Sequence, residues 1–211
     1  MARVSLTRRK VELWIDLRSP FSFLAKDPAY QLESDFDVEL RLRPFALDIA
    51  GAVNLSDPEA IARGMRKIKY FYLDARRFAN QRGITLMGPK KIFDQTLVHL
   101  AWLYADQSNH GRALIDLAFP RFFKREIDYE DRGAIVSLLQ DAGVDPAGFD
   151  AFAAGEGPGE LKRHQHEAEQ QGVFAVPTFV VDGELFWGQD RIDFVRAKLS
   201  SGATAAAAPR S

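Results

Sequence analysis

The chain has 211 residues, enough for one domain with a buried core or for a small domain that carries an insertion. Hydrophobic residues make up 46% and charged residues 27%, a balance typical of globular proteins rather than disordered or fibrous ones. The 28 basic and 29 acidic residues leave no positive field to recruit nucleic acid, and the lack of cysteine excludes disulfides, thiolate metal sites and a cysteine nucleophile.

The start of the chain shows no pattern for export or membrane insertion. Residues 3–10 include the basic residues Arg3, Arg8, Arg9 and Lys10. Glu12 and Asp16 then interrupt the following apolar residues before they can form the core of a signal peptide. No apolar run approaches the roughly 18 residues of a membrane span. We therefore expect a cytoplasmic protein with no membrane partner and no nucleic-acid partner.

The first predicted element is a strand over residues 11–17, where apolar residues occupy every second position and Trp14 is the one large apolar residue out of phase. A helix is predicted over residues 20–33. Ser19 stands at its N-cap and Pro20 at its first position, where each residue type is favoured. The Ser19 hydroxyl is therefore expected beside unpaired backbone N–H groups, an end of a helix that attracts anions.

A second strand is predicted over residues 37–42, and a long stretch with helical spacing and no strand pattern follows it. After a glycine-rich break and a further helix, two short strands are predicted near the C-terminus, with Asp182 and Gly183 as the two-residue turn between them. The predicted helices are 56–82, 92–106, 111–124, 129–142 behind a cap at Asp128, about 146–153, 160–171 and 190–199, and the later predicted strands are 178–182 and 184–187.

These elements predict an α/β protein with a four-stranded mixed sheet and a large all-helical insertion. The first two strands are joined through a helix and should be parallel, whereas the last hairpin must be antiparallel because its turn is so short. This is a thioredoxin-like arrangement. We expect residues 11–50 and 156–200 to form the thioredoxin-like domain, residues 51–155 to form the inserted helical domain, and residues 1–10 and 201–211 to be flexible tails.

Two motifs carry a resemblance to a known family. Residues 16–25, DLRSPFSFLA, resemble the N-terminal motif of the 2-hydroxychromene-2-carboxylate isomerase and kappa-class glutathione transferase branch of the DsbA-like thioredoxin superfamily. Residues 172–191, GVFAVPTFVVDGELFWGQDR, resemble its C-terminal motif. The resemblance covers residues 11–199, but residues 51–57 depart from the glycine-asparagine, proline-rich loop of the family. Its pattern on the first inserted helix is matched by Lys67, Tyr70, Asp74 and Arg77.

The resemblance implies a glutathione site with Ser19 as the catalytic residue. Ser19 occupies the place of the attacking cysteine of the fold, so its hydroxyl would donate to the sulfur of a bound thiol instead. Val176 and Pro177 match the cis-proline dipeptide, whose backbone would hold the peptide of glutathione much as an added strand does. Gln189 and Asp190 match positions for the γ-glutamyl end. Asn54 and Lys67 are the further expected contacts, Lys67 to an acidic substrate or to the glycine carboxylate.

The implied function is a glutathione-dependent cis-trans isomerase of unsaturated aromatic acids in aromatic compound catabolism, acting as a homodimer. A kappa-like glutathione transferase or peroxidase and a non-catalytic thiol- or partner-binding protein remain alternatives. Taken alone, Ser19 fits a simple helix cap better than a catalytic residue, and it is the match at Val176, Pro177 and Thr178 that favours a chemical role. His99 is expected to be packed in its helix. No metal site is expected, because His164 and His166 would diverge on a helix surface.

Overall fold

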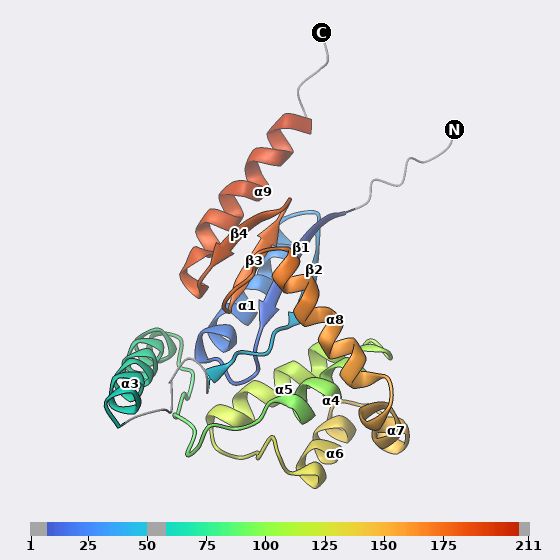
Figure 1. Ribbon diagram of the computed structural model, residues 1–211. Coiled ribbons are helices and arrows are strands. Elements are labelled where there is room, and N and C mark those ends of the chain that lie inside the picture. The colour runs from blue at the N-terminus through green and yellow to red at the C-terminus, as the bar shows by residue number, and fades with distance from the viewer. Residues whose placement is uncertain (1–7, 50–57, 207–211) are drawn as a thin grey trace.

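The computed structural model describes residues 8–49 and 58–206, and the side chains of these residues up to residue 201. Its centre is a four-stranded sheet with the order β2-β1-β3-β4 (Figure 1). β1 (Arg9–Ile15) pairs in parallel with β2 (Val38–Pro44) and antiparallel with β3 (Thr178–Val181), which pairs antiparallel with β4 (Glu184–Trp187). The predicted mixed sheet and both predicted strand orientations are confirmed.

Helices connect the two halves of this sheet. α1 (Pro20–Asp35) links β1 to β2, and the described residues between β2 and β3 contain helices and no strand. None of the described helices is long and apolar enough to cross a membrane. The remaining helices are α3 (Pro58–Gln81), α4 (Thr96–Asp106), α5 (Gly111–Phe123), α6 (Arg132–Asp141), the 3-10 helix η1 (Pro146–Gly148), α7 (Phe149–Ala154), α8 (Gly157–Gln170), the 3-10 helix η2 (Gln189–Arg191) and α9 (Ile192–Ala206).

Both faces of the sheet are covered, which explains the out-of-phase Trp14. The alternating residues of β1, such as Leu13, join a large core that also includes α1, α9 and the helices α4 to α7. Trp14 points the other way into a second core with Ala168 of α8 and Val176, and it is fully buried. Figure 1 shows α8 and α9 on opposite sides of the sheet. A strand that is buried on both faces is apolar at in-phase and out-of-phase positions alike.

Several predicted element boundaries were wrong by a few residues. β1 ends at Ile15 rather than Leu17, because the chain turns there toward α1. α4 begins at Thr96 rather than near residue 92. α9 continues to Ala206, into the segment expected to be a flexible tail, in keeping with the high helix propensity of its alanine residues.

The helix cap predicted at Asp128 is also corrected. α6 begins behind Asp131, whose carboxylate accepts hydrogen bonds from the backbone N–H groups of Gly133 at 2.7 Å and Ala134 at 3.2 Å. Asp128 instead accepts from the backbone N–H of Glu130 in the preceding turn. Both aspartates satisfy cap chemistry, and the sequence pattern alone did not distinguish them.

Candidate active site

Ser19 caps α1, as its position in the sequence predicts. Its Oγ accepts a hydrogen bond from the backbone N–H of Ser22 at 3.2 Å, and the side chain is nearly buried. This bond uses a lone pair of the hydroxyl oxygen and leaves the hydroxyl hydrogen free to be donated. The first turn of α1 carries no acidic side chain, so the positive end of the helix dipole is uncompensated there. The local chemistry favours an anion beside Ser19.

The turn before Ser19 holds a buried ion pair between Asp16 and Arg18, which are 0% and 6% exposed. Arg18 donates to the Asp16 carboxylate from Nε at 3.1 Å and from Nη2 at 2.7 Å, and the backbone N–H of Leu47 donates to it at 2.9 Å. Burial alone would raise the pKa of Asp16, but the hydrogen bonds and charge of Arg18 outweigh burial and lower it. The Asp16 carboxylate is therefore ionised, and the positive charge of Arg18 balances its negative charge.

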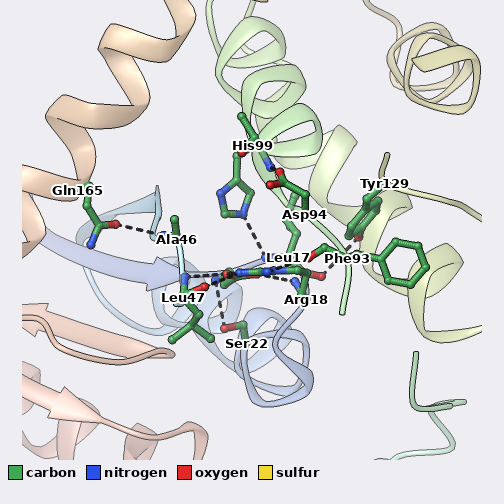
Figure 2. A network of polar contacts seen from close by, with 12 residues as sticks. Leu17, Arg18, Ser22, Ala46, Leu47, Phe93, Asp94, His99, Tyr129 and Gln165 are labelled. Carbon is green, nitrogen blue, oxygen red and sulfur yellow. Dashed lines mark hydrogen bonds and ion pairs between the residues drawn. The ribbon is translucent and has the colours of Figure 1, made fainter. Parts of the chain in front are cut away.

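Arg18 also ties the turn to distant parts of the chain. Its guanidinium donates to the carbonyl of Phe93 at 2.8 Å and to the carbonyl of Leu47 at 2.7 Å. Figure 2 shows this network, in which Arg18 lies at the centre of contacts from several segments. Because the planar guanidinium offers donors in fixed directions, it fixes the turn relative to both carbonyls.

Two residues of the helical region contact the same turn at Leu17. The Nε2 atom of His99, on α4, accepts a hydrogen bond from the Leu17 N–H at 3.3 Å. The hydroxyl of Tyr129 lies 3.4 Å from the Leu17 carbonyl oxygen and 3.1 Å from that of Ala118 (Figure 2). Burial lowers the pKa of His99 to about 4, so the ring is neutral at physiological pH and can accept this bond.

His99 is completely buried, which confirms that it is packed in its helix, but its contact to the Ser19 turn was not predicted from the sequence. The buried pair of Asp16 and Arg18 and the contact of Tyr129 were not predicted either. An acidic residue three positions before a helix-capping serine and a basic residue directly before it were the available signal for the pair. No local pattern reveals partners that lie 82 and 112 positions away, as His99 and Tyr129 do from Leu17.

The predicted cis peptide bond between Val176 and Pro177 is confirmed. Because Trp14 of β1 pairs with Thr178 of the antiparallel β3, the residues after β1 and those before β3 lie at the same edge of the sheet. This edge carries both the Ser19 turn and Val176. Among the described residues, neither the backbone N–H nor the C=O of Val176 has a hydrogen-bond partner. An extended peptide could use both groups.

Gln189 and Asp190 form the start of η2 rather than the first turn of α9. The Gln189 side chain is buried, and its amide oxygen accepts a hydrogen bond from Arg82 at 3.2 Å. The amide N–H groups, the second lone pair of the amide oxygen and the backbone of Gln189 are not used by this bond. Asp190 is exposed, and its carboxylate lies 3.5 Å from the guanidinium of Arg191.

Lys67 lies on the exposed surface of α3, near the start of α1. Its Nζ is 5.6 Å from the ring centroid of Phe71, and Phe71 makes an edge contact with Phe21 in the first turn of α1 at 6.3 Å. These two contacts place the Lys67 charge toward the N-terminal end of α1, which Ser19 caps. The pair of Asp74 and Arg77, 2.9 Å apart, is an ion pair on the helix surface. Asn54 lies outside the described residues.

Comparisons with known proteins agree with this architecture. Residues 10–200 match the model of the DSBA-like thioredoxin domain. A 2-hydroxychromene-2-carboxylate isomerase of Sphingobium xenophagum is 29% identical over 196 residues, covering 90% of this chain and 98% of that protein. A protein of the same name from Pseudomonas putida is 27% identical over 187 residues, covering 86% of this chain and 90% of its own.

Solved structures show the same fold. A selenomethionine 2-hydroxychromene-2-carboxylate isomerase superposes with a TM-score of 0.75 at 22% identity, covering 94% of this chain and 98% of its own. A probable DsbA oxidoreductase from Streptomyces coelicolor superposes with a TM-score of 0.77 at 22% identity, covering 96% and 93% of the two chains. The likeness therefore includes the helices between β2 and β3 as well as the sheet.

Proposed function

Because the chain belongs to the DSBA-like thioredoxin domain family, we propose that it is a glutathione-dependent isomerase of an unsaturated aromatic acid. Disulfide exchange requires a protein thiolate, and this chain contains no cysteine. Curated relatives over most of its length are named 2-hydroxychromene-2-carboxylate isomerases. The observation that carries the proposal is Ser19, which caps α1 while its hydroxyl hydrogen stays free to act on a bound thiol.

The residues at this edge of the sheet fit a thiol tripeptide. The N–H and C=O of Val176, which have no hydrogen-bond partner in the part of the chain that the structure describes, offer one donor and one acceptor to a peptide that lies alongside like an added strand. The N-terminus of α1 favours a thiolate, as it does where a cysteine occupies such a position. Lys67 is a cation near this edge that would hold a carboxylate, either of the glycine end of glutathione or of the acidic substrate.

Bound glutathione would supply a thiolate that adds reversibly to a conjugated carbon, so that the former double bond can rotate before the thiolate leaves. Ser19 would donate its hydroxyl hydrogen to the sulfur and so favour the ionised thiol. The bond from the Ser22 N–H to Ser19 Oγ keeps the hydroxyl oxygen in place during this step. The Asp16 carboxylate does not oppose the thiolate, because Arg18 neutralises it.

The proposal is tested by following the thiol. A trace of glutathione should support many turnovers of candidate unsaturated aromatic acids, the free thiol should stay constant, and substrate and product should have the same mass. S-methylglutathione, which keeps the peptide but lacks the thiol, should bind without supporting turnover. Loss of one thiol per product, with a conjugate of increased mass, would instead indicate the transferase. Failure to bind glutathione at all would favour the non-catalytic alternative.

A further inference from the structure

The turn from Asp16 to Ser19 has a partner for each of its four backbone N–H groups. Three partners lie within the local segment: Ser22 Oγ accepts from Asp16 at 3.4 Å, Asp16 Oδ1 from Arg18 at 2.7 Å, and the Asp16 carbonyl from Ser19 at 2.9 Å. The partner of the fourth, the Leu17 N–H, is His99 on α4. Of these four bonds, the one to His99 alone links the peptide backbone of the turn to the helical region.

The chemistry of His99 indicates that its ring serves this bond rather than packing alone. Nε2 accepts from Leu17, so the neutral ring must carry its hydrogen on Nδ1, which is buried and has no hydrogen-bond partner among the described residues. A buried N–H without a partner is destabilising. An apolar ring would fill the same space against Trp102 without that penalty. The acceptor nitrogen is what a histidine adds here.

Tyr129 contacts the carbonyl oxygen of Leu17, whereas His99 contacts the N–H of the same residue. The Tyr129 ring is fully buried and stacks on Phe122, with ring centroids 4.4 Å apart, so the position of its hydroxyl is fixed by packing. That hydroxyl has one hydrogen, which it shares between the carbonyl oxygens of Ala118 at 3.1 Å and Leu17 at 3.4 Å. The N–H of Leu17 therefore faces His99, and its C=O faces a shared donor held in place by packing.

We propose that His99, supported by Tyr129, is a positioning residue that sets the place and direction of the Ser19 hydroxyl. This inference rests on the proposed function, because it concerns the efficiency with which Ser19 acts on a bound thiol. His99 and Tyr129 act through the backbone at Leu17 and need not touch glutathione or substrate. A displacement of about 1 Å at a reacting group can cost about 100-fold in rate, so we expect the two bonds that fix the backbone at Leu17 to affect kcat.

The test uses His99→Phe, which keeps a buried ring but removes the acceptor, and His99→Gln, whose amide oxygen can restore it. His99→Phe should lower kcat by about 10-fold to 100-fold and raise the pKa of the bound thiol, with little change in the Kd of glutathione. His99→Gln should recover most of the loss. His110→Phe is the matched control, because His110 lies at the start of α5 and contacts Ser108 instead of the turn.

A double-mutant cycle separates positioning from general damage. If His99 acts through Ser19, His99→Phe should have no further effect on turnover in a Ser19→Ala background. An equal fall in kcat with and without Ser19, or a full kcat in His99→Phe, would overturn the proposal. Should His99→Phe fail to fold, Tyr129→Phe takes its place in the cycle, with Tyr104→Phe as its control because that hydroxyl bonds the distant carbonyl of Asp145.

Amide hydrogen exchange tests the role of His99 separately from the proposed glutathione-dependent activity. Exchange at the Leu17 N–H should be faster in His99→Phe and unchanged in His110→Phe, whether or not glutathione is present. If the wild-type protein shows no glutathione-dependent turnover, the proposed function fails, while faster exchange at Leu17 would still support the role of His99 in fixing the turn. Unchanged exchange at Leu17 would overturn that role.

Discussion

Replacing Ser19 by alanine tests whether the residue is a catalyst or only a helix cap. The structure assigns two losses to this change. Removal of the bond to the Ser22 N–H should cost about 1 kcal/mol of the free energy of unfolding, the usual value for an N-cap. Removal of the hydroxyl donor should lower kcat by about 10² to 10³, since that is the effect of deleting one donor to a developing negative charge.

The expected loss of stability is too small to explain the expected fall in kcat by unfolding. A loss of about 1 kcal/mol shifts Tm by about 2–4 °C in a chain of this size, and with a total stability of about 5–15 kcal/mol the protein remains folded. Asp131→Ala is the matched control, because Asp131 caps α6 with similar bonds, to the N–H groups of Gly133 and Ala134 rather than to a group of the turn. It should show the same shift in Tm and an unchanged kcat.

The assay measures kcat with saturating glutathione, the Kd of glutathione by calorimetry, and Tm, for the wild-type protein and both variants. Most affinity is expected from the peptide backbone at Val176, so Kd should change little in Ser19→Ala. Ser19→Thr, which keeps a hydroxyl and a cap, should retain most of the activity. Full activity in Ser19→Ala would refute the reasoning and show that Ser19 is only a cap.

Three further predictions concern stability and are measured by urea unfolding. Asp16→Asn leaves the buried charge of Arg18 without its counter-ion and should cost about 3–5 kcal/mol; a loss below about 1 kcal/mol would contradict the buried pair. Burial lowers the pKa of His99 from 6.5 to about 4, so between these pH values the unfolded chain binds a proton that the folded chain does not. Stability should therefore fall by about 3 kcal/mol as the pH decreases through this window, and a His99→Phe variant should lack that part of the decline. Gly188→Ala should cost about 1–3 kcal/mol, because its φ of 123° lies in a region that side chains rarely adopt; Gly159→Ala, in helix α8 with nothing within 4 Å of the new Cβ, is the control and should leave stability unchanged or raise it by up to about 1 kcal/mol.

The local parts of the structure could be predicted from the sequence because local rules decide them. The cap at Ser19, the turn at Asp182 and Gly183, and the four strands each follow from a few neighbouring residues. The limits of elements were less accurate where two residues satisfy the same rule, as Asp128 and Asp131 do. The burial of Trp14 could not be read from alternation, because it depends on α8 covering the second face of the sheet.

In the candidate site, too, local motifs could be predicted from the sequence and contacts between distant segments could not. Ser19, Val176 and Pro177 were proposed from short motifs, and β1 and β3 carry the Ser19 turn and Val176 to one edge of the sheet. The surroundings of Ser19 were missed, because the partners of its turn come from distant segments and no residue near the turn specifies them. Gln189 illustrates a further limit, since its burial and its bond to Arg82 depend on the end of α3.

The network around Arg18 and Leu17 also bears on the order in which the protein folds. Its bonds close loops of 29 residues to Leu47, 75 to Phe93, 82 to His99 and 112 to Tyr129. Closing such loops costs chain entropy before the contacts can compensate for it, so long-range contacts form late in folding. A refolding chain should regain helix signal first and catalytic competence last, because the Ser19 turn takes its final shape only after the segments that carry Leu47, Phe93, His99 and Tyr129 have come together around it.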